Sequence, residues 1–439
     1  MKSLEDIWTA VRDSFWAVPA FVVLVAVALA LILVEMQQVF DRDTLAAWPR
    51  LFGAGAAGSR GMLSAIAGSM ITVAGVVFSV TIVALSLASS QYTSRVLRNF
   101  MRDRSNQMVL GAFVGIFAYC LVVLRTIRGG DEGAFVPGLA VLFAVALAFV
   151  GIGVLIFFIH HIGTSIQASH ILAAVAKDTL AAVERLFPEV GEPTDEAEDG
   201  ETTAHGRAGR AVLSLRTGYI QRVSVDALFE IALARQTIVR MERGVGAFVI
   251  EGTPLASLVE IEGNDGIDPD AVRQINAAYT IDRQRTVDQD AAYGIRQLVD
   301  VALKGLSPGI NDVTTAVMCV DYLTAVLVRL AGRQLASPLR SESGELRVIG
   351  CRPTYADLVA DTFDQIRQNA DGNVAMLRRL LESLETLSAV TISRPRRRVL
   401  FLHAEAVVEV ITRSVESPRE RDALESQARR VSESLNGGL

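Results

Sequence analysis

Four long stretches without charged side chains dominate the first 176 residues of the chain. They run from Ala17 to Val34, between Arg60 and Arg95, between Arg104 and Arg125, and from about Phe135 towards Lys177. A bilayer core about 30 Å thick requires about 20 apolar residues of helix, and a helix satisfies its own backbone hydrogen bonds in lipid. The pattern therefore predicts four membrane-spanning helices. The fourth stretch is too long for the bilayer and is expected to continue as a stalk helix into water.

The rest of the chain mixes short apolar runs, turn residues and amphipathic helical periods. Alternation at Thr237 to Met241 and at Ala247 to Ile250, between glycine turns, predicts strands. Helical periodicity dominates after Asp290. The predicted fold is an α-helical integral membrane protein with four transmembrane helices and a C-terminal cytoplasmic α+β domain, which contains a small β-module and a helical bundle. The expected domains are a transmembrane domain (1–160), a stalk helix (161–187), an acidic loop (188–207), a β-rich module (208–285) and a helical cytoplasmic domain (286–439).

Composition supports this division of the chain. Residues 1–176 hold only 11 of the 42 Lys and Arg and 9 of the 48 Asp and Glu. The net charge of −6 lacks the basic footprint that phosphate binding needs, so we expect no nucleic acid partner. The three cysteines show neither disulfide nor metal spacing. A soluble enzyme, a secreted disulfide scaffold and a disordered chain are excluded.

Orientation follows from the short loops. Gln91 to Gln107 contains four arginines and one acid, whereas Gly129 to Ala134 contains Asp131 and Glu132. The loop rich in arginine should face the cytoplasm. We therefore expect a multi-pass protein of the bacterial cytoplasmic (inner) membrane with both termini in the cytoplasm.

The second uncharged stretch carries small and hydroxylated residues at heptad spacing, on adjoining lines of one helix. This seam consists of Gly61, Ala65, Gly68, Thr72, Gly75, Ser79, Ser86 and Ser89. Small residues permit tight helix packing. Around a central axis, hydroxyls can instead replace the water of a permeating ion. Both interpretations stay open, and self-association of the chain is compatible with either.

Three histidines, His160, His161 and His170, follow the last apolar run near its expected inner boundary. A ring of them could respond to pH near neutrality, and anchoring at the interface is the alternative. Adjacent histidines point about 100° apart on a helix, and no carboxylate accompanies them. We therefore predict no metal site.

The densest polar segment is read as a helical hairpin. Asp290 is expected to cap the first helix, and the sequence Ser307 to Asp312 ends it and starts the second. If the hairpin folds back on its lead-in strand, these residues converge: Arg283, Arg285, Asp288, Asp290, Asn311, Asp312, Thr314 and Thr315. The cluster could bind an anion at a helix N-terminus or a divalent cation through carboxylates. Caps and salt bridges explain the same residues without a ligand.

The remaining segments add no catalytic motif. No nucleophile elbow, phosphate loop or zinc motif occurs, so nothing supports an enzyme or a cofactor. The order of elements around Val245 to Leu255 resembles the barrel-sandwich hybrid of biotinyl carriers, but the lysine that carries the cofactor is missing. Arg394 to Arg398 forms a basic knot that could touch anionic lipid or lie in a solvated loop.

Three longer phrases resemble one bacterial family. They are AGSMITVAGVVFSVTIVALSLASSQYTSRVLRNFMRDR, FIHHIGTSIQAS and RTVDQDAAYGIRQLVDVALKGLSPGINDVTTA. Together they resemble the predicted membrane protein family catalogued as domain of unknown function 2254. The resemblance implies a four-span membrane part with a cytoplasmic domain, and it implies no activity.

The functional hypothesis follows from the seam and the stalk. We expect an oligomeric, channel-like protein in the lipid bilayer that is regulated by its cytoplasmic domain through a small ion or anionic ligand. The alternative is a non-conducting membrane-anchored sensor or scaffold that binds a cytoplasmic ligand.

Overall fold

The computed structural model describes residues 16–39, 55–91, 104–129, 135–165, 167–188, 209–260, 268–335, 339–342 and 345–437. The chain divides into two compact units, Met1–His170 and Ile171–Leu439. Two predicted loops, the one rich in arginine and the one with Asp131 and Glu132, lie mainly outside the described residues. Nearly all of the acidic loop lies outside them as well. Each unit is considered by itself.

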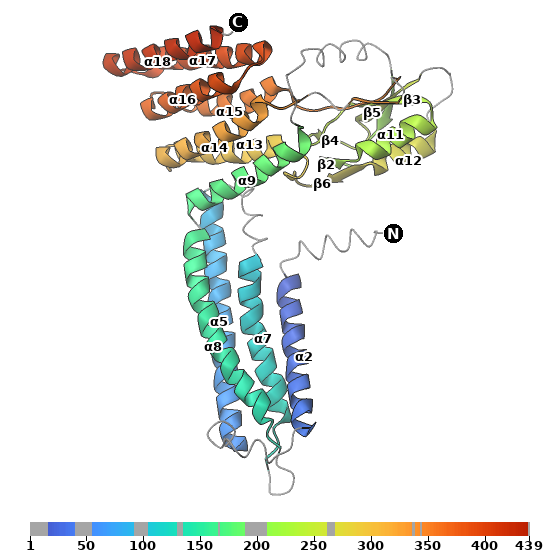
Figure 1. The fold of residues 1–439 in the computed structure, drawn as a ribbon, viewed down its shortest axis with the longest axis vertical. Coiled ribbons are helices and arrows are strands. Elements are labelled where there is room, and N and C mark those ends of the chain that lie inside the picture. The colour runs from blue at the N-terminus through green and yellow to red at the C-terminus, as the bar shows by residue number, and fades with distance from the viewer. Residues whose placement is uncertain are drawn as a thin grey trace. The chain divides into compact units, whose positions relative to one another are not determined.

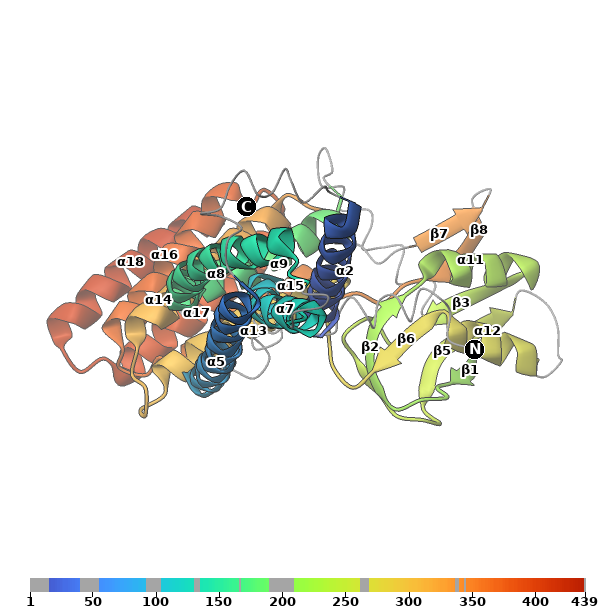
Figure 2. The same cartoon turned by 90° about the horizontal axis from the view of Figure 1, so that it is seen from below.

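The first unit is a bundle of four helices that lie side by side (Figures 1 and 2). They are α2 (Ala17–Val39), α5 (Ala56–Gln91), α7 (Arg104–Thr126) and α8 (Gly138–Ser165). Helix α7 packs against the other three, as α8 also does, and its contacts with α2 and α5 are the most extensive of the bundle. Gly111 and Gly115 make this possible, since Cβ atoms there would lie 3.0 Å from Pro19 Cα and 3.3 Å from Val22 Cγ1 of α2.

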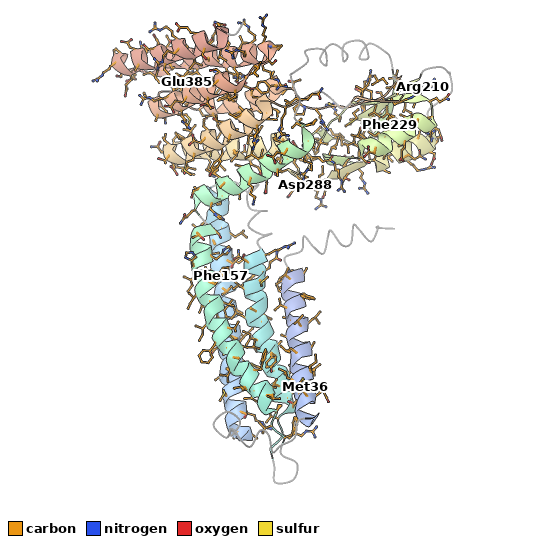
Figure 3. All side chains as sticks on the ribbon, viewed as in Figure 1. Met36, Phe157, Arg210, Phe229, Asp288 and Glu385 are labelled. Atoms are coloured by element: carbon orange, nitrogen blue, oxygen red, sulfur yellow. The ribbon has the colours of Figure 1, made fainter. Side chains whose placement is uncertain are left out.

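The bundle keeps its apolar side chains on both the inside and the outside. Phe113 and Tyr119 are fully buried, and the Tyr119 hydroxyl donates a hydrogen bond to the carbonyl of Ala140 at 2.8 Å. Met36 and Phe157 project outwards with 40% and 50% of their surface exposed (Figure 3). Large apolar residues around the whole circumference are expected of a bundle surrounded by lipid.

Five helices of the described residues are long and apolar enough to cross a membrane, one more than the four predicted. The fifth is α14 (Val313–Ala331), which belongs to the second unit. It packs against α13 (Ala291–Leu306) and α16 (Val374–Val390), and its Asp321 forms an ion pair with Arg379 of α16. Burial among helices accounts for its apolar sequence, because core helices are apolar over much of their circumference.

The fourth apolar stretch does not continue as one uninterrupted helix. Helix α8 ends at Ser165, and α9 (Ala168–Leu186) begins three residues later. The backbone N–H of Gln167 donates to the carbonyl of Thr164 at 3.2 Å. The pattern also changes at this point, since α8 is apolar all round whereas α9 buries one stripe of apolar residues. The absence of charge in the sequence hid this change of periodicity.

The β-module contains two sheets. The first sheet has the order β1-β5-β3-β8-β7 and the second the order β4-β2-β6. The strands are β1 (Arg210–Leu213), β2 (Gly218–Val223), β3 (Thr237–Met241), β4 (Phe248–Val249), β5 (Pro254–Glu260), β6 (Tyr279–Asp282), β7 (Leu339–Glu342) and β8 (Glu345–Ile349). Helices α11 (Val225–Ala234) and α12 (Pro269–Ala277) pack beside these strands.

The first sheet extends beyond the predicted module boundary. Strand β8 pairs with β3 in parallel, with Val239 opposite Val348, and β7 continues the sheet. Both strands come from the segment that the sequence assigns to the helical domain. Parallel pairing across more than 100 residues has no local signal in the sequence, which explains the omission.

The helical part of the second unit follows its sequence signals closely. The remaining helices are α15 (Tyr355–Gln368), α17 (Arg394–Ser414) and α18 (Pro418–Asn436). Thr354 and Asp357 form a capping box at the start of α15, and Ser417 caps α18. Ser224 caps α11, because its hydroxyl accepts the N–H of Ala227.

Helix α13 lies against α9 at Gly294. A Cβ atom there would overlap the Thr179 hydroxyl and lie 2.8 Å from Thr179 Cβ. We expect Gly294→Ala to destabilise the second unit by about 2 kcal/mol, because neither backbone can easily retreat. Gly332→Ala is the matched control, since a Cβ there meets nothing within 4 Å. Thermal unfolding and hydrogen exchange of α9 measure the effect, and equal behaviour of the two variants would contradict this packing.

Candidate functional site

Helix α5 is buried within the bundle along one heptad line. Its buried positions recur at steps of three and four, and most of them carry small or apolar side chains. They are Ser59, Leu63, Ala67, Met70, Ala74, Val77, Thr81 and Ala84. This line packs against α7 and α8, as Gly151 of α8 shows, where a Cβ would meet the Met70 sulfur at 3.1 Å.

The predicted seam lies on the opposite face of the same helix. Its members follow the buried positions by about two residues, which is about 200° of rotation at 100° per residue. The exposed members are Gly61, Ala65, Gly68, Thr72, Gly75, Ser79 and Ser86. The side chain of Ser89 lies outside the described residues. No other described part of the chain therefore covers this face of α5.

The three seam glycines have open space in front of them. A Cβ atom at Gly61, Gly68 or Gly75 would meet no heavy atom within 4 Å. This contrasts with Gly111 on α7, against which α2 packs closely. Close packing inside this chain thus accounts for the glycines of α7 and leaves those of the α5 seam unexplained.

The seam is uncharged and rich in oxygen. The Thr72 hydroxyl donates to the carbonyl of Gly68 at 2.8 Å, as hydroxyls in apolar helices commonly do. Its hydrogen is used in this bond, so its oxygen presents lone pairs to a neighbour. The one charged residue of α5 is Arg60, whose guanidinium donates to the Ile127 carbonyl at 2.7 Å.

The histidines do not form a shared site. His160 and His170 are exposed, whereas His161 is half-buried, stacks on Phe157 and lies 3.3 Å from the Ser165 hydroxyl. Within the described ranges, no group of three or more His, Cys, Asp and Glu side chains has the spacing of a metal site.

In the second unit, Arg285 and Asp290 form a bidentate ion pair. Arg285 donates from Nε and Nη2 to the two carboxylate oxygens at 2.8 and 3.0 Å. The same carboxylate accepts the N–H of Tyr293 at 3.0 Å, so Asp290 is the predicted cap of α13. The guanidinium also lies 5.1 Å from the Tyr293 ring centroid. Gly246 keeps this space open, because a side chain there would overlap the pair.

Burial shifts the pKa of Asp290. Only 4% of the Asp290 side chain is exposed, against 26% for Arg285. Desolvation raises the pKa of Asp290, and the Arg285 guanidinium opposes this rise. Two neighbouring residues of the predicted cluster, Arg283 and Asp288, take no part in this ion pair. Arg283 is exposed. Asp288 is also exposed (Figure 3), and its carbonyl accepts a hydrogen bond from Arg185 at 2.6 Å.

Asp312 caps the next helix. Its carboxylate accepts the N–H and the hydroxyl of Thr315 at 3.0 and 2.5 Å, and these bonds lower its pKa. Asn311 precedes it with a φ of 51°, a left-handed conformation that Asn tolerates, and Thr314 is exposed. Helix α13, with 16 residues, spans about 24 Å between Asp290 and this turn. The structure therefore does not bring the eight predicted residues together.

Several arginines cap helix C-termini, a role that was not predicted from the sequence. Arg396 donates to the carbonyls of Leu330 and Ala331 at the end of α14. Arg397 donates to Ser388 and Leu435, near the ends of α16 and α18. Both arginines belong to the first turns of α17, so the basic knot lies in a helix rather than in a loop, and its Arg394 and Arg398 are exposed. The many arginines in the segment were the visible signal, but the carbonyl partners of Arg396 and Arg397 lie 6 to 66 residues away.

The ion pair between Arg285 and Asp290 predicts that the stability of an Arg285→Ala variant depends on pH. Arg285→Ala should cost about 2–3 kcal/mol at neutral pH, because it leaves a buried carboxylate without its cation. The pKa of Asp290 then rises further above its unfolded value, so stability is lost as the pH rises through that pKa and is partly regained on acidification. Thermal unfolding measured from about pH 3.9, the unfolded pKa of Asp, upwards to neutral pH follows this loss. Arg283→Ala, an exposed neighbour, should behave like the wild type at every pH, and a flat profile for Arg285→Ala would contradict the pairing.

The Asp312 cap predicts the opposite dependence on pH. Asp312→Ala should cost about 1 kcal/mol at pH 7, seen as faster hydrogen exchange in the first turn of α14. The lowered pKa of Asp312 means that its contribution is present above an unfolded pKa of about 3.9 and disappears as the pH falls through the folded value. Asp312→Asn keeps a capping oxygen and should match the wild type. Equal loss in both variants would argue against capping.

Comparisons with known proteins place the chain in a family. A profile described as predicted membrane protein (DUF2254) matches residues 12–386. Uncharacterized proteins of Mycobacterium tuberculosis (strain ATCC 25618 / H37Rv) and Mycobacterium bovis (strain ATCC BAA-935 / AF2122/97) are each 33% identical to it over 435 residues, which cover 96% of this chain and 81% of theirs. No solved structure shows significant similarity to the chain. With its apolar helices and its match over most of its length, the chain belongs to this family of predicted membrane proteins.

Proposed function

We propose that the chain assembles as a homo-oligomer through the exposed seam of α5. The observation that carries this proposal is that α5 keeps heptad spacing on two opposite faces, of which the chain buries only one. An ideal helix drifts by about 20° per heptad, so a strict heptad line stays aligned only against a partner helix. Glycines at every seventh position, with open space before them, let such a partner approach closely.

We further propose a four-span membrane part, with α14 as a core helix of the second unit. The four helices of the first unit expose large apolar side chains, whereas α14 packs against α13 and α16 and pairs Asp321 with Arg379. The bias of arginine in the loops supports cytoplasmic termini in the bacterial inner membrane.

The function that the seam supports best is a passive channel regulated by the second unit. In an oligomer, the hydroxyl oxygens of Thr72, Ser79 and Ser86 would line the axis at successive levels. Lone pairs directed outwards, as at Thr72, favour a cation over an anion. Helix α5 carries no charged group beyond Arg60, and coupled transporters usually place an ionisable group near the middle of the membrane.

The alternative is a non-conducting sensor or scaffold, in which the same seam only joins copies of the chain. Small residues and hydroxyls also stabilise interfaces that hold no water. Both functions require the oligomer, and only the channel requires a path for ions along the seam. Assembly and conduction therefore need separate tests.

Assembly is tested by disulfide crosslinking in membranes. In a Cys351→Ser background, which removes the exposed thiol, Thr72→Cys and Ser79→Cys should crosslink two chains on mild oxidation. Phe78→Cys and Val80→Cys are the matched controls, because both positions are exposed on α5 but lie about 90–110° from the seam. Crosslinking of the controls as readily as the seam positions would contradict the proposed interface.

Conduction is tested by ion flux into vesicles that contain the purified protein. The triple variant Thr72→Val, Ser79→Ala, Ser86→Ala removes the hydroxyls with little change in volume. Cation flux should fall about tenfold or more, since a dehydrated ion loses its oxygen ligands, while crosslinking at Gly75→Cys is retained. Absence of flux in the wild type with crosslinking intact would favour the non-conducting alternative.

A further inference from the structure

A cavity of about 120 Å³ lies inside the second unit, where α9 ends and α13 begins. Its apolar wall includes Phe187, Val223, Met241, Val245 and Leu358. Its polar lining consists of Gln289, Asp290, Cys351 and Arg352. The cavity thus joins one apolar side to one polar side, as binding sites for small molecules commonly do.

The charges that line the cavity do not cancel. The carboxylate of Asp290 is neutralised by Arg285 and also accepts the N–H of Tyr293. Arg352 remains as a further cation. Its one hydrogen bond goes from Nη1 to the Leu186 carbonyl at 3.0 Å, and its guanidinium lies 5.7 Å from the Phe187 ring centroid.

Arg352 forms no ion pair with a carboxylate among the residues that the structure describes. Burial alone lowers its pKa, without a nearby acid to oppose the shift. Charges taken out of water are usually paired, because their desolvation costs several kcal/mol. Within the part of the chain that the structure describes, the half-buried Arg352 on the polar side of the cavity therefore has no carboxylate partner.

We propose that this cavity binds a small monoanion with an apolar part, of the class of short-chain carboxylates, with its charge on Arg352 and its chain against Phe187 and Met241. A cavity of about 150 Å³ holds benzene, so the available space fits a ligand of about six non-hydrogen atoms. The site is independent of the α5 seam and of ion conduction.

The competing explanation is that Arg352 only caps the C-terminus of α9. Arg333 already performs this task, since it donates to the carbonyls of Phe187 and Glu184. Arg333 does not line the cavity, whereas Arg352 does. The two arginines therefore form a matched pair that separates capping from ligand binding.

The ligand class is tested by titrating the full-length protein in detergent with butyrate and with butyramide, its neutral counterpart, using calorimetry. Butyrate should bind at least tenfold more tightly, because a charge-assisted hydrogen bond contributes about 1.5–3 kcal/mol. Octanoate should bind more weakly than butyrate. Failure of butyrate to bind, equal binding of butyramide, or tighter binding of octanoate would overturn the proposal, and the last result would point to an acid derived from lipid.

The location is tested with three variants. Arg352→Met should weaken butyrate binding at least tenfold, and Arg333→Met should leave it unchanged. Ala292→Leu fills the cavity from α13 without touching either arginine, and it should also abolish binding. Thermal unfolding verifies that each variant is folded, and if Arg352→Met does not fold, Ala292→Leu decides alone. Unchanged binding in Ala292→Leu, or in folded Arg352→Met, would overturn the site.

Discussion

Helix α5 presents two opposite heptad faces, and the packing of the bundle depends on the fact that only one of them is filled. The filled face places small side chains against α7 and α8, which lets these two helices pack closely on α5. In lipid there is little hydrophobic gain from covering a helix, so association rests on close contact and on hydrogen bonds. A face of glycine, serine and threonine offers both to a partner helix and offers little to lipid chains. The exposed seam is therefore better matched to another helix than to a bilayer.

In the second unit, positively charged arginine side chains bind the C-terminal ends of helices. Four arginines there end helices by donating to C-terminal carbonyls that have no partner within the helix. Guanidinium groups suit this position, because each can donate to several carbonyls and favours the negative end of the helix dipole. Arg396 also lies 5.0 Å from the Tyr355 ring centroid. Two arginines of a cluster that resembles a membrane anchor in sequence, Arg396 and Arg397, thereby bind the ends of other helices.

Most helices could be predicted from the sequence, because caps and apolar periods are local. Asp290 and Asp312 cap helices as expected. Three features could not be predicted, since each depends on residues far apart in the chain: the pairing of β8 with β3, the partners of the capping arginines, and the side of α5 that faces the bundle. The polar residues around Asp290 and Asp312 were expected to lie together. They do not, because the whole of α13 separates the two caps.

Two carboxylates of the predicted polar cluster are engaged in helix capping and ion pairing. In the segment from Arg283 to Thr315, Asp290 and Asp312 have partners of their own, namely Arg285, Tyr293 and Thr315. Such bonds leave these carboxylates little capacity for a ligand. Arg352 is a single residue in a stretch of sequence with no recognisable motif, yet its cation lines a cavity and has no carboxylate partner among the described residues. A ligand in this cavity would contact Leu186 and Phe187 at the C-terminal end of α9.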